Sequence, residues 1–135
     1  MFDKSERSTF KYWFAHWCAY NMTALNLKCW KFKYLFHDIL KPWLKILLND
    51  YSKVRKIHRK NAKHHLTYKN VNKIDWEAMV IDWECSRYTK TNAPMNARET
   101  YEYFVVTRYK NGKISDEIKQ LLEINIPPIL KKMNL

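Results

Sequence analysis

The chain has 135 residues, enough for one domain that buries a hydrophobic core without disulfides or a structural metal. Apolar residues make up 47% of the chain and aromatic residues 16%, which excludes a largely disordered protein. No apolar run approaches the roughly 20 residues of a membrane span, and no apolar leader follows the charged first residues. We therefore expect a soluble cytoplasmic protein (in the host-cell cytoplasm if the source is a virus) without a membrane partner.

Neither the charge nor the cysteines identify a function. A formal net charge of +12 favours anionic partners such as nucleotides, nucleic acid or anionic membrane surfaces. A lysine-rich and asparagine-rich composition also arises from AT-rich coding sequence, so charge alone decides little. Cys18, Cys29 and Cys85 show no CxxC spacing, and we interpret them as buried small apolar residues.

Helical periodicity dominates the first half of the chain. Residues 10–27 place aromatic and apolar side chains at three- and four-residue steps, and this pattern predicts a helix that carries His16. A second helix is predicted over residues 29–39. Because proline suits a first helical turn, a third is predicted over residues 42–52. A basic helix is predicted over 53–63. Three apolar side chains of the third helix are expected to face the core: Trp43, Ile46 and Leu47.

The second half shows the same pattern. Helices are predicted over residues 74–88 and 98–109, and a last helix is predicted to start after Ser115 and to close or kink at residues 127–128. A polar loop at 67–73 and a turn at 92–94 separate these elements. We expect most tryptophans to lie in the core. The prediction is a single all-α domain over residues 1–135, a compact bundle of about six helices, with residues 1–8 flexible.

The candidate chemistry lies in five histidines and three aspartates. The histidines all precede the midpoint of the chain: His16, His37, His58, His64 and His65. Neutral imidazole is a common metal ligand, and mixed nitrogen and oxygen ligands suit zinc, manganese, iron, cobalt or nickel. His37 and Asp38 are neighbours in the sequence. On a helix, adjacent side chains point about 100° apart, so the two can bind one ion if the end of the helix abuts a cleft. His58 and His65, seven residues apart, share a face if their helix continues.

Residues 35–42, with the sequence LFHDILKP, resemble the signature of the HD-domain superfamily of metal-dependent phosphohydrolases. The members have a histidine on an early helix, a His-Asp pair, often a lysine three residues later, and an aspartate on a later helix. The matching residues occur here in that order: His16, His37-Asp38, Lys41 and Asp82. A closer resemblance, covering most of the chain, is to a family of small uncharacterised bacterial and phage proteins. That family combines an HDxxK element, a histidine-rich stretch (58–65 here) and an Asp-Trp pair (82–83 here).

The resemblance implies an HD-like fold that holds one or two divalent ions (Mn, Fe, Zn, Co or Ni). The implied ligands are His16, His37, Asp38 and Asp82, with His58 and His64 or His65 serving a second ion or a phosphate. It also implies that Lys41, Arg59 and His65 bind the substrate and that Asp38 assists as general base. The implied reaction is hydrolysis of a nucleotide, or another small phosphate ester, by a metal-activated water.

Other interpretations stay open at this point. A His-Asp dipeptide is often a surface pair, His16 on an aromatic helix resembles a satisfied core histidine, and His64 and His65 fit a solvated helix end. Asp75 is interpreted as a charge at a helix N-terminus rather than as a ligand. Two alternative functions remain: a catalytically inactive HD-like domain that binds metal or senses a nucleotide, and a basic nucleic-acid-binding protein.

Overall fold

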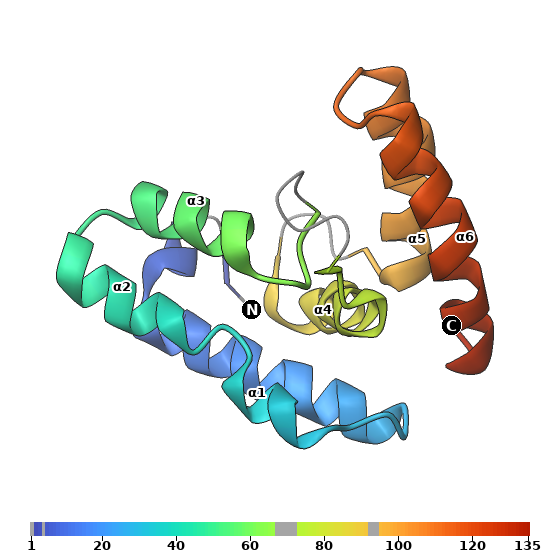
Figure 1. The fold of residues 1–135 in the computed structure, drawn as a ribbon. Helices are drawn as coiled ribbons and strands as arrows, with labels where there is room; N and C mark the ends of the chain where they lie inside the picture. Colours follow the sequence, from blue (N-terminus) through green and yellow to red (C-terminus); the bar gives the residue numbers. More distant parts are fainter. Residues whose placement is uncertain (1, 4, 67–72, 92–94) are drawn as a thin grey trace.

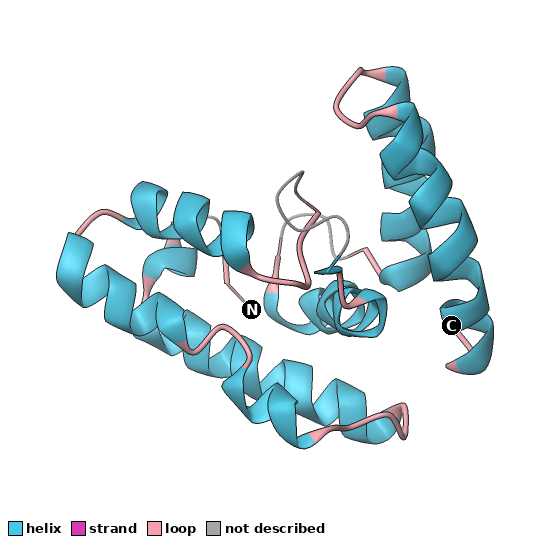
Figure 2. Ribbon diagram, in the orientation of Figure 1, coloured by secondary structure: helices cyan, strands magenta, loops and turns pink. Residues whose placement is uncertain are grey.

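The computed structural model describes residues 2–3, 5–66, 73–91 and 95–135, and its regular elements are all helical (Figures 1 and 2). In chain order they are η1 (Glu6–Ser8), α1 (Phe10–Asn26), η2 (Phe32–Phe36), α2 (Leu40–Leu48), α3 (Tyr51–Asn61), α4 (Trp76–Thr89), α5 (Ala97–Glu102), η4 (Tyr103–Arg108) and α6 (Asp116–Lys132). Within these ranges, the one β-type pairing is an isolated bridge between Phe2 and Lys90. The all-α prediction is confirmed. The predicted turn at 92–94 and all but the end of the predicted loop lie outside the described residues.

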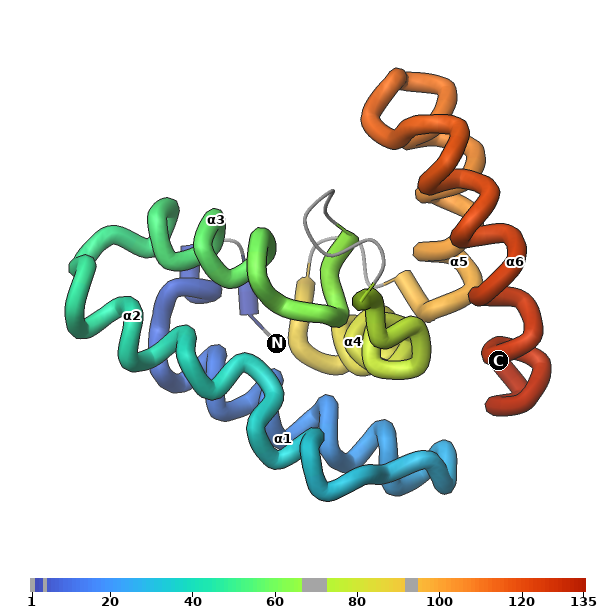
Figure 3. Tube along the Cα trace, in the orientation of Figure 1, coloured from blue at the N-terminus to red at the C-terminus, as the bar shows by residue number. Residues whose placement is uncertain are grey.

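The hydrophobic core joins α1, α4 and α6. In Figures 1 and 3, α4 lies between α1 and the antiparallel pair formed by α5–η4 and α6. Tyr20 of α1, Ile81 of α4 and Leu122 of α6 are fully buried there. Burial of such a side chain stabilises the fold by about 1.5–3 kcal/mol. Neither α2 nor α3 contributes a residue to this cluster, so these two helices need other attachments.

Polar caps set the helix starts. The Asp75 carboxylate accepts the backbone N–H of Ala78, and Ser115 accepts that of Ile118, as their positions predicted. Between α2 and α3 the predicted boundary is wrong by a few residues. Asn49, with φ 47°, ends α2 in a left-handed conformation, and the Asp50 side chain then caps α3.

Pro127 and Pro128 do not close the last helix. The structure continues α6 through both prolines to Lys132. Each proline removes one N–H donor, which leaves the carbonyl four residues earlier, at Glu123 and Ile124, without its helical partner. Both of those residues are exposed on the same side as the prolines, so water can satisfy the carbonyls.

The expectation that α2 faces inward is also wrong. Trp43, Ile46 and Leu47 are 64%, 74% and 78% exposed, and none of the residues of α2 is buried. Trp30, another tryptophan expected in the core, is also exposed. The periodicity of α2 correctly predicts an amphipathic helix, but its opposite face, which carries Lys41 and Lys45, is the one turned toward the molecule.

Candidate metal centre

The segment before α2 makes short-range backbone hydrogen bonds and is also held by side chains of α1. The indole N–H groups of Trp13 and Trp17 donate to the backbone carbonyls of Asp38 and Leu35, at 2.9 and 2.8 Å. Asn21 Nδ2 donates to the carbonyl of Tyr34. The backbone bonds span three residues, as from the N–H of His37 to the carbonyl of Tyr34, and the predicted helix over 29–39 is wrong: only the short η2 forms.

His37 and Asp38 follow η2 in an irregular conformation. Asp38 has φ 55°, in the left-handed region that aspartate tolerates better than most residues. On a helix, the side chains of two adjacent residues would point about 100° apart. In this turn, those of His37 and Asp38 instead point toward the same place. The His37 Nε2 atom lies 3.6 Å from Asp38 Oδ2, and both side chains are buried. The adjacent pair can therefore serve one centre.

Side chains from α1 and α4 complete a first group around this pair. The Nε2 atom of His16 lies 3.1 Å from that of His37 and 3.0 Å from Asp82 Oδ1. His37 Nε2 lies 3.3 Å from the same Asp82 oxygen, and His16 lies 3.7 Å from Asp38 Oδ2. The four residues come from positions 16, 37–38 and 82, so the predicted convergence of distant segments is confirmed.

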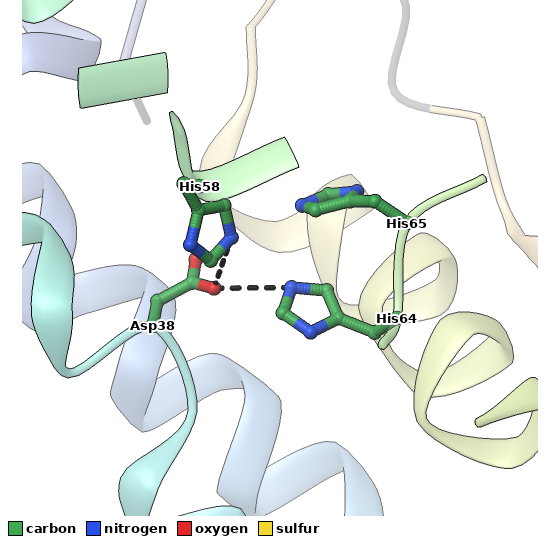
Figure 4. A group of neighbouring side chains, drawn as sticks. All are labelled: Asp38, His58, His64 and His65. Carbon is green, nitrogen blue, oxygen red and sulfur yellow. Dashed lines mark ion pairs between the residues drawn. The ribbon is translucent and has the colours of Figure 1, made fainter. Parts of the chain in front are cut away.

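A second group shares Asp38 and faces α3 (Figure 4). Asp38 Oδ1 lies 2.8 Å from His58 Nε2 and 3.0 Å from His64 Nε2. The His65 ring lies beside both histidines, with centroids 5.0 and 4.3 Å away. α3 ends at Asn61, so His64 and His65 reach the site from the following turn, and the predicted shared helical face of His58 and His65 is wrong.

The surroundings keep most imidazoles neutral and the carboxylates ionised. Burial lowers the pKa of His37 to about 4 and also lowers those of His58 and His65. Burial raises the pKa of Asp38, but nearby His37 and Lys41 more than offset it and hold the value well below its usual range. For Asp82, contacts with two histidines likewise outweigh burial and lower the pKa. Neutral imidazole and ionised carboxylate are the states that bind metals.

Several site atoms converge without a directed hydrogen bond. Asp38 Oδ1, His58 Nε2 and His64 Nε2 are buried and make none, although the oxygen lies within 3.0 Å of both nitrogens. Buried polar atoms of this kind are costly unless something satisfies them. In the first group, ligand atoms of His16, His37 and Asp38 lie within 4.8 Å of one another, and in the second group those of Asp38 and its three histidines do. The buried nitrogen and oxygen donors therefore fit a divalent cation, and the shared Asp38 fits either one ion or two.

A cationic pocket opens onto the groups. A cavity of about 380 Å³ reaches His16, Asp38 and Asp82. It includes the predicted substrate-binding residues Arg59 and His65. Five cationic side chains line it: Arg7, Lys41, Arg55, Arg59 and Lys90. The Lys41 ammonium also donates to Asp38 Oδ2 at 2.6 Å, so this lysine neutralises the aspartate as well as lining the pocket.

Sequence reasoning missed several residues of this pocket. Arg7 belongs to the segment expected to be flexible, and Lys90 follows α4. Burial lowers the pKa of Lys90. The pairing of Phe2 with Lys90 brings these two distant segments together, through Phe2 N–H to the Thr89 carbonyl at 2.8 Å. No local motif marks either residue, because only the tertiary pairing brings them to the site.

Cys85 was also missed as a neighbour of the site. Its Sγ donates to the carbonyl of Asp82 at 3.2 Å and lies 3.8 Å from His16 Nδ1. Burial and the charge of Asp82 raise the pKa of this thiol well above its usual value. Cys85 is therefore a protonated side chain, and it is buried as predicted. It lies beside the His16 ring on the Nδ1 side. Cys18 and Cys29 are half-buried.

Comparisons of the chain with protein-family models, curated proteins and solved structures gave no match. The HD-domain resemblance therefore stays a prediction, and the functional argument depends on the geometry of the site. No helix among the described residues is long and apolar enough to cross a membrane.

Proposed function

We propose that this protein is a metal-dependent phosphohydrolase that acts on a nucleotide or another small phosphate ester. The observation that carries the proposal is the juxtaposition of a buried histidine–aspartate cluster with a pocket lined by five cationic side chains. The first feature suits a divalent cation, and the second suits an anionic substrate. Asp38 belongs to both features, which supports a single site for metal and substrate.

Two sets of residues would hold the ion or ions. His16, His37, Asp38 and Asp82 supply the first set, and His58 and His64 extend it through Asp38. When bound, a divalent cation lowers the pKa of a water molecule and neutralises phosphate oxygen. We assign the metal to the group of manganese, iron, zinc, cobalt and nickel from the donor types alone.

The chain's own residues would bind and orient the ester. Arg55 and Arg59 of α3 offer guanidinium groups that match phosphate oxygens in pairs, and Lys90, which follows α4, adds a point charge to the same pocket. Asp38 has one oxygen beside Lys41 and the other beside His58 and His64. Because Oδ2 accepts from Lys41, buried Oδ1 faces two imidazole nitrogens, and its pKa is depressed, we assign Asp38 a ligand role and not that of the principal base.

Elemental analysis of the purified protein, followed by a screen of nucleotides and phosphate esters, tests the proposal. We expect bound transition metal and metal-dependent release of phosphate, with His37→Ala and Asp82→Asn losing both. Asp116→Asn removes a carboxylate from the exposed start of α6 and serves as the matched control, which should retain both.

Three outcomes would overturn the hydrolase proposal. A folded protein that takes up no metal would remove its basis. Bound metal with no turnover across the panel would favour the alternative of an inactive HD-like domain that binds a metal or senses a nucleotide. Salt-sensitive binding of DNA or RNA without metal would favour a nucleic-acid-binding protein.

A further inference from the structure

α2 exposes a continuous apolar face. Leu40, Trp43, Ile46 and Leu47 are each at least 64% exposed, and their three- and four-residue spacing places them on one side of the helix. Single exposed apolar residues are ordinary, but a contiguous group of this kind marks an interaction surface. The sequence analysis expected these side chains in the core, so their exposure needs a separate explanation.

Neighbouring aromatic residues extend this face on both sides of α2. Phe10 of α1 lines a cavity together with Ile46. Phe36 of η2 lines another cavity together with Leu40. Phe10 and Phe36 are 64% and 55% exposed. We call the set Phe10, Phe36, Leu40, Trp43, Ile46 and Leu47 the α2 face. It joins three segments of the chain into one apolar surface.

The α2 face lies in the strongly basic part of the chain. Residues 9–63 contain twelve lysines and arginines against two aspartates, Asp38 and Asp50. Asp38 is buried in the candidate metal centre, and Asp50 caps α3. Residues 73–135, by contrast, contain ten cationic and nine acidic side chains. An apolar face carried by a segment with such an excess of positive charge matches a surface that is both apolar and anionic.

We propose that the α2 face docks onto an anionic lipid bilayer surface, with α2 lying in the interface. Amphipathic helices with tryptophan and aliphatic residues on one side and lysines around them bind such surfaces without crossing them. Nearby lysines add attraction to anionic headgroups. With nine residues, α2 is far too short to span a bilayer. The proposal does not depend on the hydrolase activity.

Other occupants fit the α2 face less well. A second copy of the chain would bring two strongly positive surfaces together, which opposes association. Nucleic acid would be attracted by the charge and could stack on Phe10, Phe36 and Trp43, but the aliphatic half of the α2 face (Leu40, Ile46 and Leu47) offers no ring for bases. An anionic bilayer satisfies the apolar and the charged features together.

Vesicle flotation with the full chain tests the proposal. We expect the protein to bind vesicles of phosphatidylcholine mixed equally with phosphatidylserine, and to bind pure phosphatidylcholine at least about tenfold less. Leu47→Gln should weaken binding about tenfold, because it removes a side chain that would enter the lipid. Ile124→Gln is the matched control: Ile124 is 68% exposed on α6, in the nearly neutral half, and its variant should bind as the parent does.

Thermal unfolding of each variant shows that the change has not altered the fold, which is expected because Leu47 is 78% exposed. Absence of binding to the anionic vesicles would overturn the proposal, as would equal losses in the two variants. A dimer in light scattering that Leu47→Gln dissociates, without vesicle binding, would assign the α2 face to a second copy. Binding of DNA or RNA that Leu47→Gln leaves unchanged, again without vesicle binding, would assign the basic region to nucleic acid.

Discussion

The helices of residues 73–135 and the pair α2–α3 are held in place by different forces. α4 and α6 share a continuous apolar core with α1, in which Ile81, Leu122 and Ile126 are fully buried. α2 has no buried residue, and α3 buries only Val54 and His58. Polar contacts attach the pair instead: Lys41 and His58 with Asp38, and Lys45 with the carbonyl of Ser8.

This difference has a consequence for the candidate metal centre. The candidate ligands lie between the well-packed part and the α2–α3 pair, since Asp82 comes from α4 and His58 from α3. Loss of a core side chain should therefore unfold the whole domain, whereas occupancy of the metal centre should chiefly affect α2 and α3. Four experiments test this comparison.

Leu122→Ala should have the largest effect. It removes a fully buried side chain from the core, and we expect the free energy of unfolding to fall by about 2–5 kcal/mol. Leu47→Ala makes the same chemical change on the exposed α2 face and should alter it by less than about 0.5 kcal/mol. Denaturant unfolding followed by circular dichroism measures both. Equal losses would mean that α2 is packed as tightly as the core.

Metal occupancy should protect α2 and α3 selectively. At a metal concentration about a thousand times the Kd, binding stabilises the folded state by about 4 kcal/mol. Hydrogen exchange with and without metal should show slower exchange in α3 and the segment before α2, with less change in α6. The effect should disappear in His37→Ala. Uniform slowing along the chain would contradict the proposed difference between the two parts.

Trp13→Phe should loosen the site while leaving the core intact. It removes the N–H donor to the Asp38 carbonyl and should cost about 1 kcal/mol, with weaker metal binding in calorimetry. Trp83→Phe is the control, because it replaces an indole that stacks on Phe104, with ring centroids 5.2 Å apart, away from this segment. If both variants bind metal as the parent does, the tryptophan contact does not position Asp38.

Asp75→Asn should have the smallest effect, and it should depend on pH. Burial raises the pKa of Asp75, but Lys33 and the N–H of Ala78 more than offset it and lower the pKa from its ordinary value of 3.8. The carboxylate therefore adds stability above that value, and the gain is lost as the pH falls through the lower pKa of the folded state.

Because Lys33 is exposed and asparagine can also cap a helix, the loss at neutral pH should be at most about 1 kcal/mol. Denaturant unfolding of the parent and the variant should give curves that converge in acid. A difference that does not change with pH would show that the charge of Asp75 contributes nothing.

The pattern of the sequence correctly predicts the helical class, most helix starts within a few residues and many of the residues that meet at the candidate site. Three- and four-residue spacing predicts α1, α4 and α6 because each buries one face, Ser115 predicts its cap from local chemistry alone, and Asp75 is predicted as a charge at a helix start. His16, His37-Asp38, His58, His64 and Asp82 were expected together, and the structure brings them within ligand distance. Their roles in hydrolysis stay predictions.

Only the tertiary structure decided which face of α2 is covered and how residues 29–39 are held. An amphipathic pattern shows that a helix has two faces, but it cannot show whether a partner covers the apolar one. In the same way, no local pattern reveals that Trp13 and Trp17 of α1 donate to the carbonyls of Asp38 and Leu35. Arg7 and Lys90 reach the pocket through a pairing between segments nearly ninety residues apart. Contacts of this kind depend on how the whole chain packs, which local spacing does not encode.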